Sequence, residues 1–354
     1  MKLIDRYIFK TVAGTALVAL LVLLILETFF SFLGEIDDIG EGNYGLTDIL
    51  LYLLLNMPQR VYEIFPMALL LGGLLGMGSL ASSSELVCMR AAGLSLLRLI
   101  GAGLQVGLVL GLLALIVGEF VAPATTRLAK EWQATAKSEQ VSIRQGLGFW
   151  ARDGELLIHV GAVSPGVGLE NIHIYQIDDQ SRMRSIARAR SARYVDDRWL
   201  LEDVQRSLIE ADKVTADYQP VLTLNSLISP DLLRVLVLDP KNLSMRDLVT
   251  YIDYLDRNGL DSRSYRLAFW NKVFGPLINL AMIFVAMPFA FGSQRTVSMG
   301  QRLLIGVFFG LLFFLLNRML GNVVLLYGYP PLLGAAAPSL LIFICGAYAL
   351  HRVR

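Results

Sequence analysis

The sequence is poor in charged residues and in histidine. Only 17% of its 354 residues are charged, whereas 55% are hydrophobic, and an average soluble domain carries about 25% charged residues. The 31 basic residues nearly balance the 30 acidic residues, so the chain lacks the basic excess that nucleic-acid-binding proteins carry. These shortages argue against an ordinary water-soluble enzyme and against a nucleic-acid partner.

Motifs for catalysis and metal binding are also missing. The sequence has no G-x-x-x-x-G-K-[ST] loop for ATP phosphates, no G-x-S-x-G and no H-E-x-x-H. Its two cysteines, Cys88 and Cys345, lie far apart in apolar sequence. His159 and His173 alternate with apolar residues, as outward-facing strand residues do. We therefore predict no catalytic residue, no metal site and no cofactor held by this chain.

What the sequence does contain is long apolar runs. A helix needs about 20 mostly apolar residues to cross a bilayer, and six runs approach or exceed this length. The first is too long for a signal peptide and no small-residue cleavage site follows it, so we predict that it is retained. The predicted spans are Thr11–Leu33, Val61–Leu80, Leu97–Val121, Leu267–Phe291, Leu303–Leu326 and Leu332–Leu350.

Basic residues predict the orientation of the spans, because they are retained in short cytoplasmic loops. They cluster before the first span, after the second, after the fourth and after the sixth, whereas the loop after the first span is acidic. Both termini are therefore predicted to be cytoplasmic. The basic clusters are Lys2, Arg6 and Lys10; Arg90 and Arg98; Arg295 and Arg302; and His351, Arg352 and Arg354; the acidic loop holds Glu35, Asp37, Asp38 and Glu41.

The long insert between the third and fourth spans lies on the predicted outer side. Its apolar period falls to two in short segments such as Glu155–Val160 and Asn171–Gln176, with turn signals such as Asp153-Gly154 between them. This spacing indicates an all-β sandwich, jelly roll or open barrel. We predict an α-helical membrane bundle of six transmembrane helices, arranged 3+3, with an all-β insert. Its units are 1–123, including a cytoplasmic helix at about 82–93; 124–239, the β domain; 240–265, a connecting helix; and 266–354.

Ionisable residues inside apolar spans are costly and point to function. Glu27 lies about 24 Å along the first span and Arg318 about 22 Å along the fifth, at 1.5 Å per residue. Both spans are predicted to run outward. We therefore expect these two side chains to face one cavity, to pair when it is empty, and to release Arg318 to a phosphate when it is filled. A structural ion pair or snorkelling is the alternative, and Lys272 and Glu119 are weaker candidates.

Small residues recur at helical spacing in the second and third spans. Such faces let two helices approach closely in lipid. Packing within this chain and contact with a second membrane subunit both account for them. The residues are Gly72, Gly73 and Gly76 in the second span, and Gly103, Gly107 and Gly111 in the third.

A short cytoplasmic helix is predicted between the second and third spans. Ser82 is its expected N-cap, Glu85 follows three residues later as in a capping box, and Gly93 is its expected stop. A purely structural cap is one role for Glu85. The other is docking, because one face of this helix suits a groove on a partner. That predicted face consists of Glu85, Leu86, Met89 and Arg90.

Several stretches of sequence carry a resemblance to a known family. They are Ile4–Ile8, Phe65–Gly78 running into Ser84–Val87 and Ala91–Gly93, and Tyr327–Gly334. With the 3+3 spans and the β insert, they resemble the LptF/LptG permease family of the lipopolysaccharide exporter over the whole chain. The resemblance is closer to the LptG branch than to the LptF branch.

This resemblance implies a non-catalytic inner-membrane permease that extracts lipopolysaccharide from the outer leaflet. The implied partners are an LptF-like permease in a heterodimer, an LptB-like ATPase dimer that binds ATP and Mg, an LptC-like single-span protein and a periplasmic LptA-like bridge. The insert would be a periplasmic jelly roll, and Glu85 would be the coupling-helix glutamate. The first and fifth spans, with Glu27 and Arg318, would form the lateral gate, although some relatives carry lysines where this chain has Glu35–Glu41.

Other interpretations stay open on sequence alone. The chain suits an LptF-like paralogue or a permease for another lipid, and the partner and lipid that copurify discriminate these. A membrane-embedded lipid-modifying enzyme predicts activity without any ATPase. A structural scaffold needs the glycine faces and the β domain but not the charges within the spans.

Overall fold

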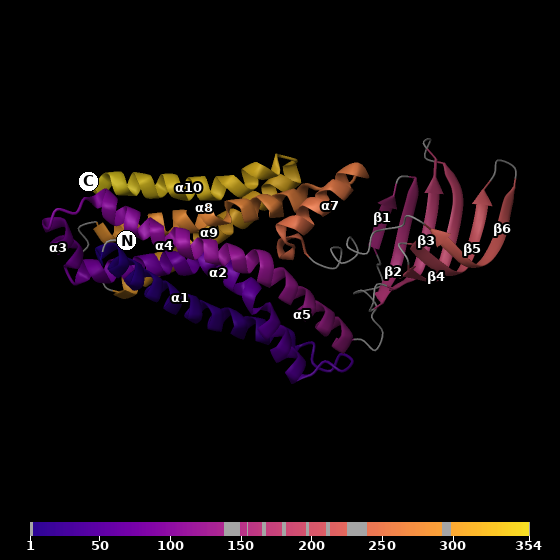
Figure 1. Cartoon of the computed structure of the whole chain (residues 1–354), viewed down its shortest axis with the longest axis horizontal. Coiled ribbons are helices and arrows are strands. Elements are labelled where there is room, and N and C mark those ends of the chain that lie inside the picture. The colour runs from indigo at the N-terminus through magenta and orange to yellow at the C-terminus, as the bar shows by residue number, and fades with distance from the viewer. Residues whose placement is uncertain are drawn as a thin grey trace.

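A computed structural model of the chain shows a long helical bundle with a β-sheet beyond one end (Figure 1). The structure describes residues 3–137, 149–153, 155–164, 168–178, 182–195, 198–209, 213–224, 239–291 and 299–353. In these ranges it contains six helical segments that are long and apolar enough to cross a membrane. The predicted 3+3 bundle with a β insert is therefore confirmed.

The helices before the insert form the first half of the bundle. They are α1 (Leu3–Ile36), α2 (Leu46–Ser82), α3 (Glu85–Ala91), α4 (Leu96–Ile116), the π-helical turn η1 (Val117–Val121) and α5 (Ala122–Lys137). The helices after it are α8 (Arg263–Phe291), α9 (Met299–Tyr327) and α10 (Pro331–Val353).

Two predicted boundaries are wrong. The helix predicted from Val61 begins at Leu46, because Asn56 and Gln59 interrupt the apolar run without interrupting the helix and are themselves buried. The third helix does not end near residue 123 but continues through η1 and α5 to Lys137. Pro123 lies directly after the π-helical turn, inside this continuous helical segment, so the predicted start of the β domain at residue 124 falls within a helix.

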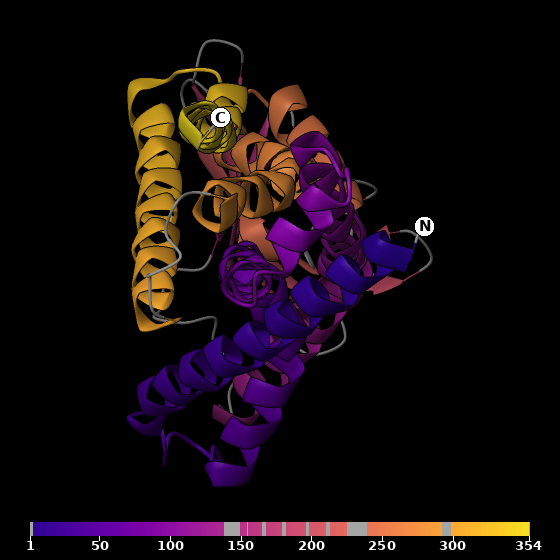
Figure 2. The same cartoon turned by 90° about the vertical axis from the view of Figure 1, so that its left-hand side faces the viewer.

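The centre of the bundle is formed by α2 and α8. In the most apolar window of each, 61% of the residues are buried, compared with 22% in α1 and 11% in α9. The end-on view in Figure 2 shows α1 and α9 on the outside of the bundle. Both therefore present long apolar faces outward, as helices in a bilayer do.

A short connecting segment leads from the insert back to the bundle. It contains the 3-10 turn η3 (Pro240–Asn242) and α7 (Met245–Arg257). The Ser244 hydroxyl accepts a hydrogen bond from the Asp247 backbone N–H at 3.1 Å, as an N-cap does. Gly259 follows the helix with φ +65°, a left-handed conformation that favours glycine. This helix lies within the predicted connecting unit, residues 240–265, and is shorter than it.

The insert contains one antiparallel sheet in which sequential strands pair with each other. Its strand order is β1-β2-β3-β4-β5-β6. The strands are β1 (Phe149–Asp153), β2 (Leu156–Ser164), β3 (Gly168–Ile177), β4 (Met183–Val195), β5 (Arg198–Ile209) and β6 (Val214–Leu224). The all-β insert is confirmed. The jelly roll stays a prediction, because residues 138–148 and 225–238 lie outside the described residues.

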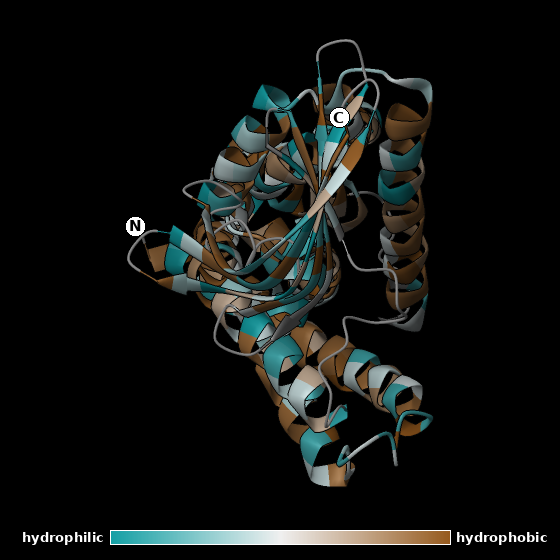
Figure 3. Ribbon diagram, turned by 90° about the vertical axis from the view of Figure 1, so that its right-hand side faces the viewer, coloured by the Kyte–Doolittle hydropathy of each residue, from teal (hydrophilic) through white to brown (hydrophobic). Residues whose placement is uncertain are grey.

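The two faces of the sheet differ in polarity. Ile158, Ile174 and Ala187 follow one another across β2, β3 and β4 and are buried in an apolar cluster formed by the sheet. Successive side chains of a strand point to opposite faces, so their sequence neighbours lie on the other side. Figure 3 shows the curved sheet with hydrophilic and hydrophobic residues alternating along its strands.

Candidate functional site

The short helix α3 is anchored to its own bundle. Leu86 is buried and Met89 packs against the same apolar cluster, which includes Ile8 of α1. The predicted docking face is therefore corrected, because its two apolar members hold α3 in place. The outward side chains of α3 are instead Val87, Cys88 and Arg90.

Glu85 is held between α1 and the start of α3. The Ser83 hydroxyl donates a 2.8 Å hydrogen bond to Glu85 Oε1, and Tyr7 of α1 lies near the same carboxylate. The predicted Ser82 cap is wrong, since Ser84 precedes the helix with φ +63° and its side chain makes no capping bond. This end of α3 therefore lies beside α1.

Glu27 forms an ion pair with a residue that sequence analysis missed. Its Oε2 lies 2.7 Å from Arg60 Nη1 on α2, and Ser31 donates to its other oxygen at 3.2 Å. The predicted pairing of Glu27 with Arg318 is therefore wrong. Arg318 is exposed on α9, and it has no ion pair or hydrogen bond within the described ranges. Arg60 stands one residue before the predicted start of the second span, so it lay outside the charges considered within the spans.

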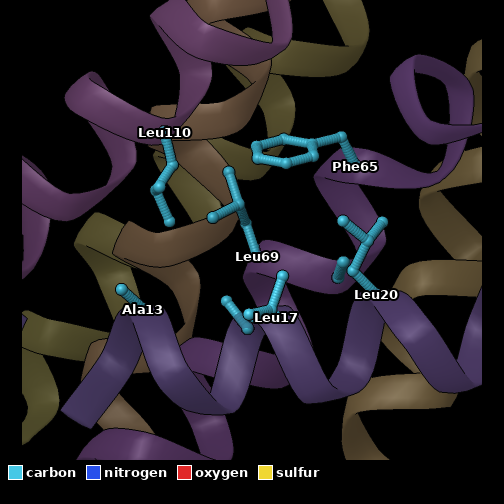
Figure 4. A pocket seen from close by; sticks show the side chains of 8 residues that line it. Ala13, Leu17, Leu20, Phe65, Leu69 and Leu110 are labelled. Atoms are coloured by element: carbon cyan, nitrogen blue, oxygen red, sulfur yellow. The ribbon is translucent and has the colours of Figure 1, made fainter. Parts of the chain in front are cut away.

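An apolar pocket lies between α1, α2 and α4, the first two of which also carry Glu27 and Arg60. Figure 4 shows Leu17 and Leu20 of α1 opposite Phe65 and Leu69 of α2, with Leu110 of α4 closing one side. Every lining side chain is apolar, so the pocket suits hydrocarbon. Its lining residues are Ala13, Ala16, Leu17, Leu20, Phe65, Ala68, Leu69 and Leu110.

The glycines of the second span set the distance between α1 and α2. A Cβ placed on Gly72 would lie 2.3 Å from the Cα of Ala16, and one on Gly76 would lie 2.9 Å from the Cα of Val12. The Thr15 hydroxyl uses this close approach to donate a 2.8 Å hydrogen bond to the Gly72 carbonyl. Both glycines therefore face another helix of the same chain.

The glycines of the third span face α8. A Cβ on Gly107 would lie 3.2 Å from Ile283 Cδ1, and one on Gly111 would lie 3.1 Å from Asn279 Cβ. A Cβ on Gly103 would overlap the end of the Met287 side chain. The small residues of both spans thus pack helices within this chain.

Lys272 lies within the protein interior and not in an open cavity. It is 4% exposed. Its Nζ lies 3.2 Å from Glu119 Oε2 and donates to the Gly118 carbonyl at 2.8 Å. The other Glu119 oxygen accepts from the Met245 backbone N–H, at the first turn of α7, at 2.7 Å. These contacts, which we call the Lys272 junction, connect α8, η1 and α7.

The π-helical turn η1 makes the Lys272 junction possible. A π-helical turn widens the helix locally and is frequent at functional sites. Here it contains Gly118, where a Cβ would lie 2.4 Å from the Tyr62 ring. Lys272 Nζ lies 5.9 Å from the centroid of that ring. Only glycine therefore lets the bulged backbone and Tyr62 of α2 pack together beside the cation.

The end of α5 partly neutralises the acidic loop after α1. Lys137 Nζ pairs with Asp38 and lies 3.9 Å from carboxylate oxygens of both Glu35 and Glu41. The same Nζ lies 4.8 Å from the centroid of the Tyr44 ring. The loop is therefore an anchor for α5, the helix that leads to the β insert, and its charge does not stand alone.

No candidate metal centre emerges from the described residues, which contain no group of three or more His, Cys, Asp or Glu side chains placed to bind an ion. His159 and His173 are neighbours on adjacent strands, with ring centroids 6.1 Å apart. The candidate site therefore consists of the charged contacts and the apolar pocket of the helical bundle.

Comparisons with known proteins agree with this architecture. The family model for the lipopolysaccharide export system permease LptF/LptG matches residues 6–352. LptG of Escherichia coli K12 is 35% identical, covering 99% of this chain and 98% of that protein. LptG of Haemophilus influenzae Rd is 34% identical, covering 99% of each. LptF of Escherichia coli K12 is 24% identical over 51% of this chain and 50% of its own length. Because the family match and the LptG matches extend over nearly the whole chain, the chain belongs to the LptF/LptG family of lipopolysaccharide export system permeases.

Proposed function

We propose that this chain is the LptG-like permease subunit of a lipopolysaccharide exporter in the bacterial inner membrane. The observation that carries the proposal is its 35% identity to an LptG protein over 99% of the chain. The LptF match is weaker and covers about half of the chain, which favours the LptG branch. A permease for another lipid is the second candidate. The lipid that copurifies with the chain discriminates between the two candidates.

The first proposed partner is an LptF-like permease in a heterodimer. The apolar faces of α1 and α9 support this arrangement, because they are the least buried spans of the described bundle. Two related subunits that meet through such helices would enclose a cavity that opens sideways to lipid. An LptC-like single-span protein and a periplasmic LptA-like bridge complete the proposed assembly.

The second proposed partner is a cytoplasmic LptB-like ATPase dimer, which would bind the ATP and Mg and supply the energy. Its contact would be α3, through the outward side chains of Val87, Cys88 and Arg90. Because Glu85 interacts with Tyr7 of α1, a pull on α3 would also move α1. In this proposal α1 and α9 form the gate, and ATPase closure narrows the space beside them by a rigid-body motion.

The proposed cargo explains why an apolar path is needed. Each methylene of an acyl chain costs about 0.8 kcal/mol when it is left in water. The pocket between α1, α2 and α4 offers hydrocarbon surroundings, and Arg60 with Glu27 stands on the same two helices. We place the acyl chains against this pocket and a phosphate beside Arg60, in competition with Glu27.

The insert is proposed to be periplasmic and to pass the lipid to the bridge. The apolar face of the curved sheet would receive the acyl chains after they leave the bundle. The basic clusters of the short loops support this orientation, with both termini in the cytoplasm. Impermeant labels that reacted with single cysteines in residues 155–224 from the cytoplasmic side would contradict it.

Purification with candidate partners tests the proposal. The chain is coexpressed with an LptF-like permease and an LptB-like ATPase, and lipids bound to the purified complex are identified by mass spectrometry. We expect lipopolysaccharide to copurify and to stimulate ATP hydrolysis. A complex that retains only another lipid, and whose ATPase activity is not stimulated by lipopolysaccharide, would support the second candidate instead.

A further inference from the structure

One row of side chains crosses the entire described sheet on the face opposite its apolar cluster. Each strand contributes one residue, and each residue is directly paired with the next. With strands about 4.8 Å apart, the row is about 24 Å long. This outer row consists of Trp150, His159, His173, Arg188, Gln205 and Tyr218.

The outer row begins with a platform of aromatic rings. The Trp150 and His159 centroids are 4.8 Å apart, and Trp150 stacks on Tyr175, a neighbour on the same face, at 5.7 Å. Tyr175 in turn stacks on His173, with an interplanar angle of 14°. Trp150 is 56% exposed, so the platform is open to a ligand.

Arg188 on β4 has no carboxylate partner among the described residues. The other three arginines of β4 have carboxylate partners: Arg184 with Asp178, Arg190 with Asp203 and Arg193 with Glu202. Arg188 is exposed, and within the described ranges it has no ion pair or hydrogen bond.

The neighbours of Arg188 in the outer row supply no counter-charge. His173 lies directly opposite it. Burial first, and then Arg188 and His159, lower the pKa of His173. None of the six members of the outer row is a carboxylate, and the one carboxylate bonded to the row, Asp203, accepts from the Tyr218 hydroxyl at 2.7 Å and also pairs with Arg190. The part of the row from Trp150 to Arg188 therefore presents rings and an arginine, and its charge favours an anion.

We propose that the outer row binds the phosphorylated saccharide of lipopolysaccharide. Aromatic faces stack on the C–H faces of sugar rings, and an arginine grips phosphate through two parallel N–H bonds. The length of the row suits several sugar units in line. The proposal rests on the export function. It assigns the sugar to the outer face of the sheet and the acyl chains to the apolar face, so that the lipid would straddle the edge strand β1.

Binding of a sugar without acyl chains tests the proposal. The probe is the phosphorylated oligosaccharide left after complete deacylation of lipopolysaccharide, which cannot occupy an apolar pocket. It is titrated calorimetrically into the full chain, purified in detergent with its LptF-like partner. We expect saturable binding that Arg188→Ala and Trp150→Ala each weaken about tenfold, the loss typical of a charged or aromatic anchor.

A matched control exists on the same strand and face. Arg184→Ala removes the same charge, but this arginine already has Asp178 as partner, so we expect less than about a twofold change, as for a surface ion pair. Arg188→Lys should restore part of the affinity. If Arg188→Ala lowers the thermal transition of the complex, Arg188→Gln replaces it as the test variant.

Several outcomes would overturn the outer-row proposal. They are the absence of saturable binding, equal losses in Arg188→Ala and Arg184→Ala, and equal affinity for the dephosphorylated oligosaccharide. Lipopolysaccharide export by the same wild-type complex is measured in parallel. If export persists without oligosaccharide binding, the outer row fails as a site while the export function stands.

Discussion

At the scale of single residues, the Lys272 junction is the most constrained feature of the bundle. A lysine that is 4% exposed shares Glu119 with the first turn of α7. A buried pair of this kind adds little net stability, because desolvation of both charges offsets their attraction. Its value lies in geometry, since it fixes the angle at which α7 leaves the bundle.

Removing one partner of the Lys272 junction should be costly. We expect Lys272→Met to destabilise the folded chain by about 3 kcal/mol, because the Glu119 carboxylate, which is only 16% exposed, then loses its cation. Denaturation in mixed micelles, followed by tryptophan fluorescence, measures the loss. The double variant Lys272→Met with Glu119→Gln should recover most of it. A double variant as unstable as the single one would contradict an ion-pair role.

Arg60 offers a second prediction at this scale. We expect Arg60→Gln to lower the lipopolysaccharide retained per purified complex by about fivefold, since one charge-assisted hydrogen bond to phosphate contributes roughly 1 kcal/mol or more. Arg60→Lys keeps the charge and should retain most of the lipid. Quantitative mass spectrometry of the bound lipid is the measurement. Unchanged retention in Arg60→Gln would remove this residue from the lipid path.

At the scale of elements, helix packing depends on single glycines. Gly72→Ala places a methyl group against the Ala16 backbone, at a distance of 2.3 Å. We expect a loss of about 1–3 kcal/mol, as is usual for overpacking. Gly14→Ala on α1 is the matched control, because a Cβ there meets nothing within 4 Å, and it should be neutral or stabilising. Equal effects in the same denaturation assay would contradict the close α1–α2 contact.

The connection between α7 and α8 should respond to acid. Arg263 lowers the pKa of Asp261 to about 2 from its ordinary 3.8, and Ser262 first, then Arg266, lower the pKa of Asp256. A carboxylate whose pKa is lowered by folding stabilises the fold. This stabilisation is fully present above the pKa of the unfolded chain, and it is lost as the pH falls through the pKa of the folded chain.

We therefore expect the α7–α8 connection to loosen between about pH 4 and pH 2. Spin labels at the exposed positions Val249 and Leu277 measure this as a broadened distance distribution. In Asp261→Asn the change over this window should be smaller, because one of the two titrating carboxylates is gone. An identical acid response in wild type and variant would contradict the assignment.

The sequence was informative about elements and poor about contacts. Apolar length revealed all six spans, and period-two alternation revealed the sheet. The predicted helix ends were wrong where buried polar residues such as Gln59 broke the apolar run, because hydropathy reports composition and not the continuity of the helical backbone. The partner of Glu27 was also missed, because Arg60 precedes the predicted second span and because pairing across helices depends on how the helices pack. The outer row needed strand register, which no spacing rule supplies.

At the scale of the whole molecule, rigid connections lead from each end of the bundle. Leu86 of α3 packs in one apolar cluster with Ile8 of α1 at one end, and the Lys272 junction connects α8 to α7 at the other. Close glycine contacts hold α1 on α2 and α4 on α8. A displacement of α3 would therefore pass through packed helices toward the insert, as the proposed coupling to an ATPase requires.

Reconstituted transport tests this account most directly. The chain, its LptF-like and LptC-like partners and the ATPase are placed in liposomes with labelled lipopolysaccharide, and transfer to a soluble periplasmic acceptor is followed by photocrosslinking. The account predicts transfer that requires both ATP and this chain, and that leaves phospholipid behind. Equal transfer without ATP, or transfer of phospholipid in place of lipopolysaccharide, would contradict it.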